Sequence, residues 1–161
     1  YALTFTFLRD LSPLFIRSLS FSGTFFSGDD TATSRAEGWF PLFGDTQRFG
    51  SWAPYILTPR DQHGMFSNLL VFTARADICF LPKMTHECTF NWAQSVERDA
   101  LMNAFALNAR ERGSWLGIRN TFQISDAMWA HFSWEHLFPG PFYQQISSNC
   151  NWISAGFFWN L

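Results

Sequence analysis

The residues of this chain that could carry metal or redox chemistry include three cysteines, and their spacing decides what they can do. The spacing matches no zinc-binding pattern and no small disulfide framework. Cys79 and Cys88 flank a tight turn at positions of opposite parity, which places them on opposite faces of a hairpin. We therefore expect no disulfide between them.

Acid–base chemistry would need histidine beside a carboxylate or a nucleophile, and the chain has four histidines. His131 and Glu135 share one strand face, but the rise of a strand separates them by about 13 Å. No Ser-His-Asp order and no nucleophile elbow occurs. We therefore expect no enzyme activity, no catalytic residue and no cofactor.

A group of carboxylates between residues 29 and 45 is the one candidate for a metal ion. Asp29 and Asp30 are adjacent, and Glu37 and Asp45 follow in the same segment. Clustered carboxylates are the ligands that calcium prefers. The sequence Gly28-Asp29-Asp30 is equally typical of a tight turn closed by side-chain hydrogen bonds, which is the interpretation we favour. We expect no bound metal.

A second set of charged or titratable side chains stands inside segments of alternating hydrophobicity, and we expect these side chains to project to one polar face. The set comprises Arg75, Asp77, Glu87, Arg119, His131 and Glu135. Side chains in this arrangement could line a pore and filter solutes by charge. They could equally pair with one another and stabilise the wall that carries them. Both interpretations stay open from the sequence.

Strands are the elements that must position these side chains, because hydrophobicity alternates with period two along most of the chain. In the segment 128–137, Met128, Ala130 and Phe132 share one face, whereas His131 and Ser133 share the other. The same alternation predicts seven strands, at residues 1–9, 15–25, 68–80, 85–95, 115–124, 128–137 and 153–161. The predicted fold class is all-β, with antiparallel strands.

The amino-acid composition indicates that the apolar faces of the strands contact a membrane rather than water. The 161 residues include 20 Phe and 8 Trp, whereas charged residues make up 15%, below the roughly 25% of soluble domains. No segment of 18 residues is apolar enough for a transmembrane helix, so a membrane would be crossed by strands. The net charge of −2 and the lack of a basic run exclude nucleic acid as a partner.

The lengths of the predicted connections alternate, as they do in outer-membrane barrels. Tight turns follow the first, third and fifth strands, and long extracellular loops are expected at about 28–66, 96–112 and 139–149. Trp92, Trp115, Trp129, Trp134 and Trp159 are candidates for an interfacial aromatic girdle. Closed single-chain barrels have even strand numbers, so we interpret residues 1–161 as a single portion, the C-terminal part, of a larger transmembrane β-barrel.

Two segments resemble loop motifs of the alginate-export family of outer-membrane barrels. They are Ser27-Gly28-Asp29-Asp30 with Glu37-Gly38-Trp39-Phe40-Pro41-Leu42-Phe43-Gly44, and Phe138-Pro139-Gly140-Pro141-Phe142-Tyr143. The resemblance implies a monomeric barrel of about 18 strands in the bacterial outer membrane. It implies passage of an anionic polysaccharide or another hydrophilic solute. Phe40 and Asp45 depart from the pattern, because the family usually has an acidic and a basic residue there.

The sequence therefore predicts a porin-like or exporter-like channel. The expected partners are outer-membrane lipid and lipopolysaccharide, the barrel-assembly machinery, and a hydrophilic solute or polysaccharide. One alternative is a soluble β-sandwich or lipocalin-like module that binds a ligand or carbohydrate in an aromatic pocket. Another is a structural outer-membrane protein beside a neighbouring envelope protein.

Overall fold

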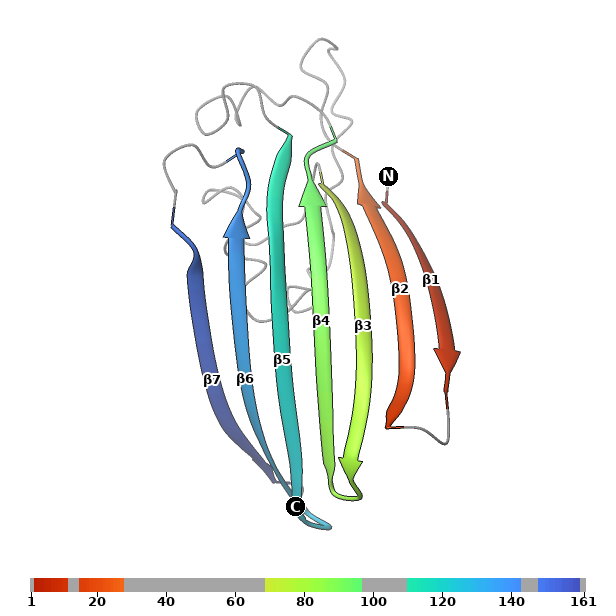
Figure 1. Cartoon of the computed structure of the whole chain (residues 1–161), viewed down its shortest axis with the longest axis vertical. Helices are drawn as coiled ribbons and strands as arrows, with labels where there is room; N and C mark the ends of the chain where they lie inside the picture. Colours follow the sequence, from red (N-terminus) through yellow and green to blue (C-terminus); the bar gives the residue numbers. More distant parts are fainter. Residues whose placement is uncertain (1, 12–14, 28–68, 97–109, 143–147, 160–161) are drawn as a thin grey trace.

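The computed structural model describes residues 2–11, 15–27, 69–96, 110–142 and 148–159. Within these residues the fold is all-β, with seven strands in one antiparallel sheet (Figure 1). The strands are β1 (Ala2–Asp10), β2 (Ile16–Phe26), β3 (Leu69–Leu81), β4 (Met84–Gln94), β5 (Glu111–Ser125), β6 (Met128–Pro139) and β7 (Cys150–Trp159). Each strand pairs with the next one along the chain, so the sheet is a simple meander.

All seven predicted strands are present, which confirms the all-β antiparallel fold, but two of them begin earlier than the alternation indicates. β5 begins at Glu111 and β7 at Cys150. In β5 the register against β4 shifts between Ala93 and Gln94, so the early residues do not follow period two. In β7 the polar residue Asn151 stands on the otherwise apolar face and interrupts the pattern.

The connections alternate in length, as predicted, and this sorts them to opposite ends of the sheet. Short turns join β1 to β2, β3 to β4 and β5 to β6 at the lower end in Figure 1. The long connections leave from the opposite end of the sheet, which we call the upper end. Most of the expected loops 28–66 and 96–112, and part of 139–149, lie outside the described residues.

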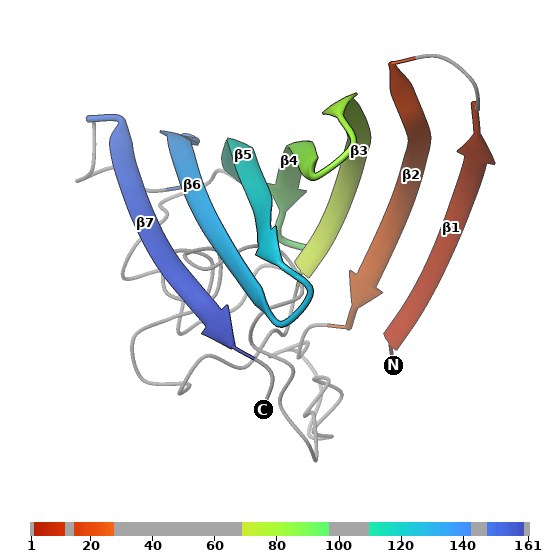
Figure 2. The ribbon, with the colours of Figure 1, turned by 90° about the horizontal axis from the view of Figure 1, so that it is seen from below.

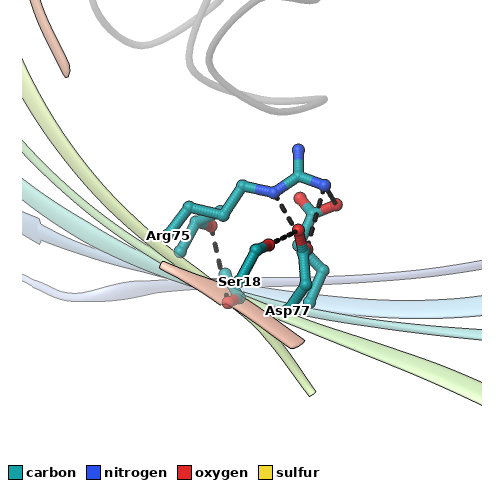
Figure 3. Close-up of polar contacts among 6 residues, drawn as sticks. Ser18, Arg75 and Asp77 are labelled. Atoms are coloured by element: carbon teal, nitrogen blue, oxygen red, sulfur yellow. Dashed lines mark hydrogen bonds and ion pairs between the residues drawn. The ribbon is translucent and has the colours of Figure 1, made fainter. Parts of the chain in front are cut away.

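The sheet is curved, and it is open, because β1 and β7 form its two edges (Figure 2). We call the concave side, which carries Ser18, Arg75 and Asp77, the inner face (Figure 3). The convex side is called the outer face. Because neighbouring residues of a strand point to opposite sides, the cross-strand register assigns each residue to one face.

The buried apolar side chains gather at the upper end of the inner face. The cluster comprises Phe26, Leu69, Val71, Ala93, Trp115 and Leu137, which extend from β2 to β6. Trp129 was a candidate for the aromatic girdle, but it lies opposite Gln123 and Phe158 in the register, which places it on the inner face. Trp115 was a candidate too, and this expectation is wrong for that residue as well. Its position is opposite Asn91 and Leu137 in the register, which places it on the inner face, where its side chain is buried.

Candidate functional site

The middle of the inner face carries the charged side chains that the sequence singled out. Cross-strand pairing runs from Asp77 on β3 to Glu87 on β4 and then to Arg119 on β5. The neighbouring row contains Arg75 and, on β6, Glu135. The register therefore places these predicted residues on one face and in two adjacent rows across the strands. Their role in lining a pore remains a prediction.

Arg75 is the centre of an ion-pair group within these rows. Its Nη2 lies 3.0 Å from Asp77 Oδ1 and 3.0 Å from Glu87 Oε2, and its Nε donates to Asp77 Oδ1 at 3.0 Å. Ser18 Oγ donates to the other carboxylate oxygen of Asp77 at 2.7 Å (Figure 3). The Arg75 side chain keeps 45% of its surface exposed. The group is thus fixed in geometry but remains in contact with solvent.

Two of the predicted residues are not drawn into this group. Arg119 lies opposite Glu87 in the register, but among the described residues it forms no ion pair. His131 lies one row nearer the lower end, where its ring stacks on Phe158 at 5.0 Å. The same ring also covers Gly156, where an added Cβ would lie 2.7 Å from His131 Cε1. Ion pairing therefore joins Arg75, Asp77 and Glu87, whereas Arg119 and His131 stand outside this group.

Uncharged polar side chains join neighbouring strands elsewhere on the inner face. Thr73 Oγ1 donates to Asn91 Oδ1 at 2.7 Å, and the hydroxyls of Ser133 and Ser154 lie 2.6 Å apart. Removing a polar group from water destabilises the folded protein unless the group is hydrogen-bonded. These hydrogen bonds therefore offset the cost of burying the polar side chains that form them. Both Asn91 and Ser133 are 2% exposed.

The outer face has the opposite character, because its large apolar side chains are exposed. Phe90 is 46% exposed beside the buried Asn91, and Phe132 is 43% exposed beside the buried Ser133. The exposed apolar residues of the outer face include Leu3, Phe5, Phe7, Phe21, Phe72, Phe80, Phe90, Phe122, Phe132, Phe138, Ile153, Phe157 and Trp159. Most large side chains of the outer face are thus apolar and exposed, whereas most polar side chains of the described sheet lie on the inner face, where Leu8 and Phe158 are exposed apolar exceptions.

Several of the polar residues that interrupt the outer face are paired with one another, and the register also places Arg9 on this face, opposite Leu19. His86 on β4 lies opposite Asn120 on β5, and His86 Nδ1 is hydrogen-bonded to Asn120 Oδ1. Nearer the upper end, Asn151 Oδ1 accepts from Trp134 Nε1 at 3.1 Å and lies 2.7 Å from His136 Nδ1. Asn120 is a polar exception to the alternation along β5, and its partner follows only from the register.

The upper end of β5 holds a buried arginine that the sequence analysis had placed in a loop. Arg112 is 1% exposed, donates from Nε to Ser95 Oγ at 2.8 Å, and lies with its Cζ 4.9 Å from the centre of the Phe142 ring. Gly113 follows with a φ of 118°, and the backbone N–H of Gly140 donates to the Arg112 carbonyl at 3.0 Å. These contacts fasten the segment after β6 to the start of β5.

Most of the loop motif on which the family resemblance depends lies outside the described residues, namely Gly28, Asp29, Asp30, Glu37, Gly38, Pro41, Phe43 and Gly44. Ser27 is described and buried, and Pro139 ends β6 before Gly140. The described residues contain no group of three or more His, Cys, Asp or Glu side chains that could hold a metal ion. The carboxylates of the proposed calcium alternative lie in the part that is not described.

Comparisons with protein-family models, with curated proteins and with solved structures found no match to this chain. No helix among the described residues is long and apolar enough to cross a membrane. The side chains on the two faces of the sheet are therefore the features that bear on function.

Proposed function

We propose that this sheet forms part of the wall of a membrane-spanning β-barrel in a bacterial outer membrane, and that the barrel lets hydrophilic solutes pass. One observation carries the proposal, namely that the outer face presents large exposed apolar side chains, whereas the inner face carries most of the polar and charged side chains. In such barrels the lipid-facing side chains are apolar and the lumen is polar. The proposal assigns the protein no catalytic activity.

The alternative of a water-soluble module agrees less well with the same observation. A β-sandwich buries its apolar face against a second sheet, and a lipocalin-like barrel turns its apolar face toward the ligand. Here Phe90 and Phe132 point to the convex outer face, whereas the concave inner face carries Arg75 and Asp77. Water-soluble monomers seldom expose an apolar patch that extends across a whole sheet.

Two further features support lipid as the neighbour of the outer face. The strands are 9 to 15 residues long, and a tilted strand needs about 9–11 residues to cross a bilayer. The polar side chains of His86 and Asn120 satisfy each other on that face. Unpaired polar groups are costly in lipid, so such pairing is expected there.

The open edges indicate what the proposed barrel needs for closure. β1 and β7 run in the same direction, because each successive strand of the meander is antiparallel to the last. Antiparallel pairing at both edges therefore takes an odd number of further strands. An edge left open in lipid would leave backbone groups unpaired. The proposal includes a larger barrel of the alginate-export type. The identity of its solute is suggested by the resemblance alone.

A structural outer-membrane protein is the second candidate, and the apolar cluster at the upper end of the inner face favours it. Phe26, Leu69 and Trp115 make this end of the inner face apolar and buried, which is unlike the wall of a wide aqueous channel. Such a protein would have the same lipid-facing surface but a closed lumen. Solute passage separates the two candidates.

The proposal is tested on the natural full-length protein, reconstituted into liposomes loaded with sugars of increasing size. A membrane-spanning channel predicts a heat-modifiable band on a gel and release of the small sugars. A heat-modifiable band without release would favour the structural protein. A water-soluble species whose gel mobility does not change with heating would contradict the membrane proposal.

A further inference from the structure

The apolar side chains of the outer face occupy different stretches of the two edge strands. On β1 the outer residues between positions 3 and 7 are apolar, and Arg9 follows them toward the lower end. On β7 the order is reversed, because Asn151 comes first and the outer residues between positions 153 and 159 are apolar. Each edge strand therefore has one polar residue at one end of its apolar stretch, and the two ends are opposite.

The cross-strand register shows that these two apolar stretches have no row in common. Phe7, the last apolar outer residue of β1, lies in the same row as Asn151, and Arg9 lies in the same row as Ile153. The row of Phe7 continues through Phe21, Ala74, Phe90, Leu116 and His136. The apolar stretch is therefore displaced toward the lower end of the sheet on passing from β1 to β7.

The strands between the two edges show the same displacement. On β4 the uppermost polar residue of the outer face is Gln94, four residues above Phe90, whereas on β6 His136 lies in the row of Phe90 itself. The polar pair of His86 and Asn120 lies below that row, and its two side chains are hydrogen-bonded to each other. The upper boundary of the apolar stretch thus descends from β4 to β6.

A tilt of the strands in a bilayer explains this displacement. A row is perpendicular to the strands, so polar residues at one membrane boundary would share a row if the strands stood upright. Between Leu3 on β1 and the row of Ile153 on β7, the apolar stretch starts six residues lower. Six residues span about 20 Å along a strand, and six strand spacings span about 29 Å, which gives a tilt of about 35°. Strands of membrane barrels tilt by about 35–45°.

We infer that the outer face is an oblique lipid-contact band, with strands tilted by about 35° from the bilayer normal. The inference rests on the proposed membrane-spanning wall and specifies how that wall meets its lipid. Lipid headgroups contact Gln94, His136 and Asn151 at the upper boundary. At the lower boundary they contact Arg9, whose guanidinium suits a lipid phosphate. A bilayer has two parallel boundaries, so the displacement of both boundaries in one direction favours lipid over a protein partner.

The test is the depth of nitroxide labels in the natural full-length protein, with its native cysteines replaced by alanine, in phospholipid vesicles. Single cysteines replace Ala74 and Ile78 on β3 and Ala155 on β7, and each is labelled. Collisions of the label with oxygen and with a water-soluble nickel chelate give its depth. Ile78 and Ala155 share a row and are four strand spacings apart, whereas Ala74 lies four residues above Ile78.

A tilt of about 35° predicts that the Ala155 label lies about 11 Å deeper than the Ile78 label and at the depth of the Ala74 label. Upright strands predict instead that Ala155 matches Ile78. That result would overturn the inference and leave the membrane proposal intact. Equal and free access of the nickel chelate to all three labels would overturn the membrane proposal and the inference with it.

Ala76 on β3 and Phe157 on β7 give a second comparison, which serves if one of the first variants does not fold. Ala76 lies in the row of Ile153, four residues above Phe157. The tilt nevertheless brings both labels to the same depth. A Phe157 label about 13 Å nearer the lower boundary than the Ala76 label would show that the strands are upright.

Discussion

Replacing Phe90 by arginine distinguishes lipid from water as the neighbour of the outer face. Phe90 lies in the middle of β4, between Ala74 on β3 and Leu116 on β5, and is 46% exposed. If lipid surrounds this position, Phe90→Arg places a charge near the middle of the bilayer. We then expect the free energy of unfolding to fall by about 2–4 kcal/mol.

The same substitution has a smaller expected effect if water surrounds the outer face. An arginine at a half-exposed strand position keeps its charged head in solvent, and surface substitutions usually change stability by about 0.5 kcal/mol or less. The measurement is equilibrium urea unfolding of the full-length protein in lipid vesicles, followed by tryptophan fluorescence and by the heat-modifiable band.

Thr89→Arg is the matched control, because Thr89 is the neighbouring residue and points to the inner face. It lies between Arg75 on β3 and Gly117 on β5, which leaves room, and Glu135 is the next residue beyond Gly117, so the new guanidinium stands between one positive and one negative charge. We expect a loss below about 1 kcal/mol for this variant. Equal losses for the two variants, or a Phe90→Arg protein that is as stable as the wild type, would refute the assignment of the outer face to lipid.

Two further predictions concern stability in the same urea assay. Gly113→Ala should cost about 1–3 kcal/mol, because φ is 118° and the added Cβ would lie 2.2 Å from the Phe138 carbonyl oxygen. Gly117→Ala, whose Cβ would meet the Thr89 side-chain hydroxyl at 2.6 Å but no backbone atom at such a distance, should cost less, and a reversed order would contradict this account. Asn120→Leu should cost about 1–3 kcal/mol because it leaves His86 unpaired on the outer face, and adding His86→Leu should recover most of the loss. A double variant as unstable as the single one would show that the pair is not the cause.

Period-two alternation was sufficient to predict the strands and the face of most residues. The reason is that a sheet with one polar and one apolar side fixes the register, since a shift by one residue would exchange the two faces. The placement of Arg75, Asp77 and Glu87 on one face followed from parity alone. That Arg75 contacts both carboxylates did not follow, because it depends on which strand neighbours which and on the register between them.

Features that depend on an irregular backbone or on the register escaped the sequence analysis. Arg112 stands where β5 shifts against β4, so parity gave no information about its burial. Trp115 was assigned to the girdle from its position near a strand end, although its parity matched that of Gly117 on the inner face. The pairing of His86 with Asn120 needed the register between β4 and β5, which no local pattern specifies.

The most direct test of the central claim is a cysteine scan along β5 in liposomes, in the full-length protein with its native cysteines replaced by alanine. Single cysteines at Arg119 and Thr121 on the inner face, and at Ile118 and Phe122 on the outer face, are treated with a water-soluble maleimide. Our account predicts labelling at the two inner positions and protection at the two outer ones. Labelling at Phe122, which is 37% exposed, together with slower labelling at Thr121 would show that water surrounds the outer face and would contradict the account.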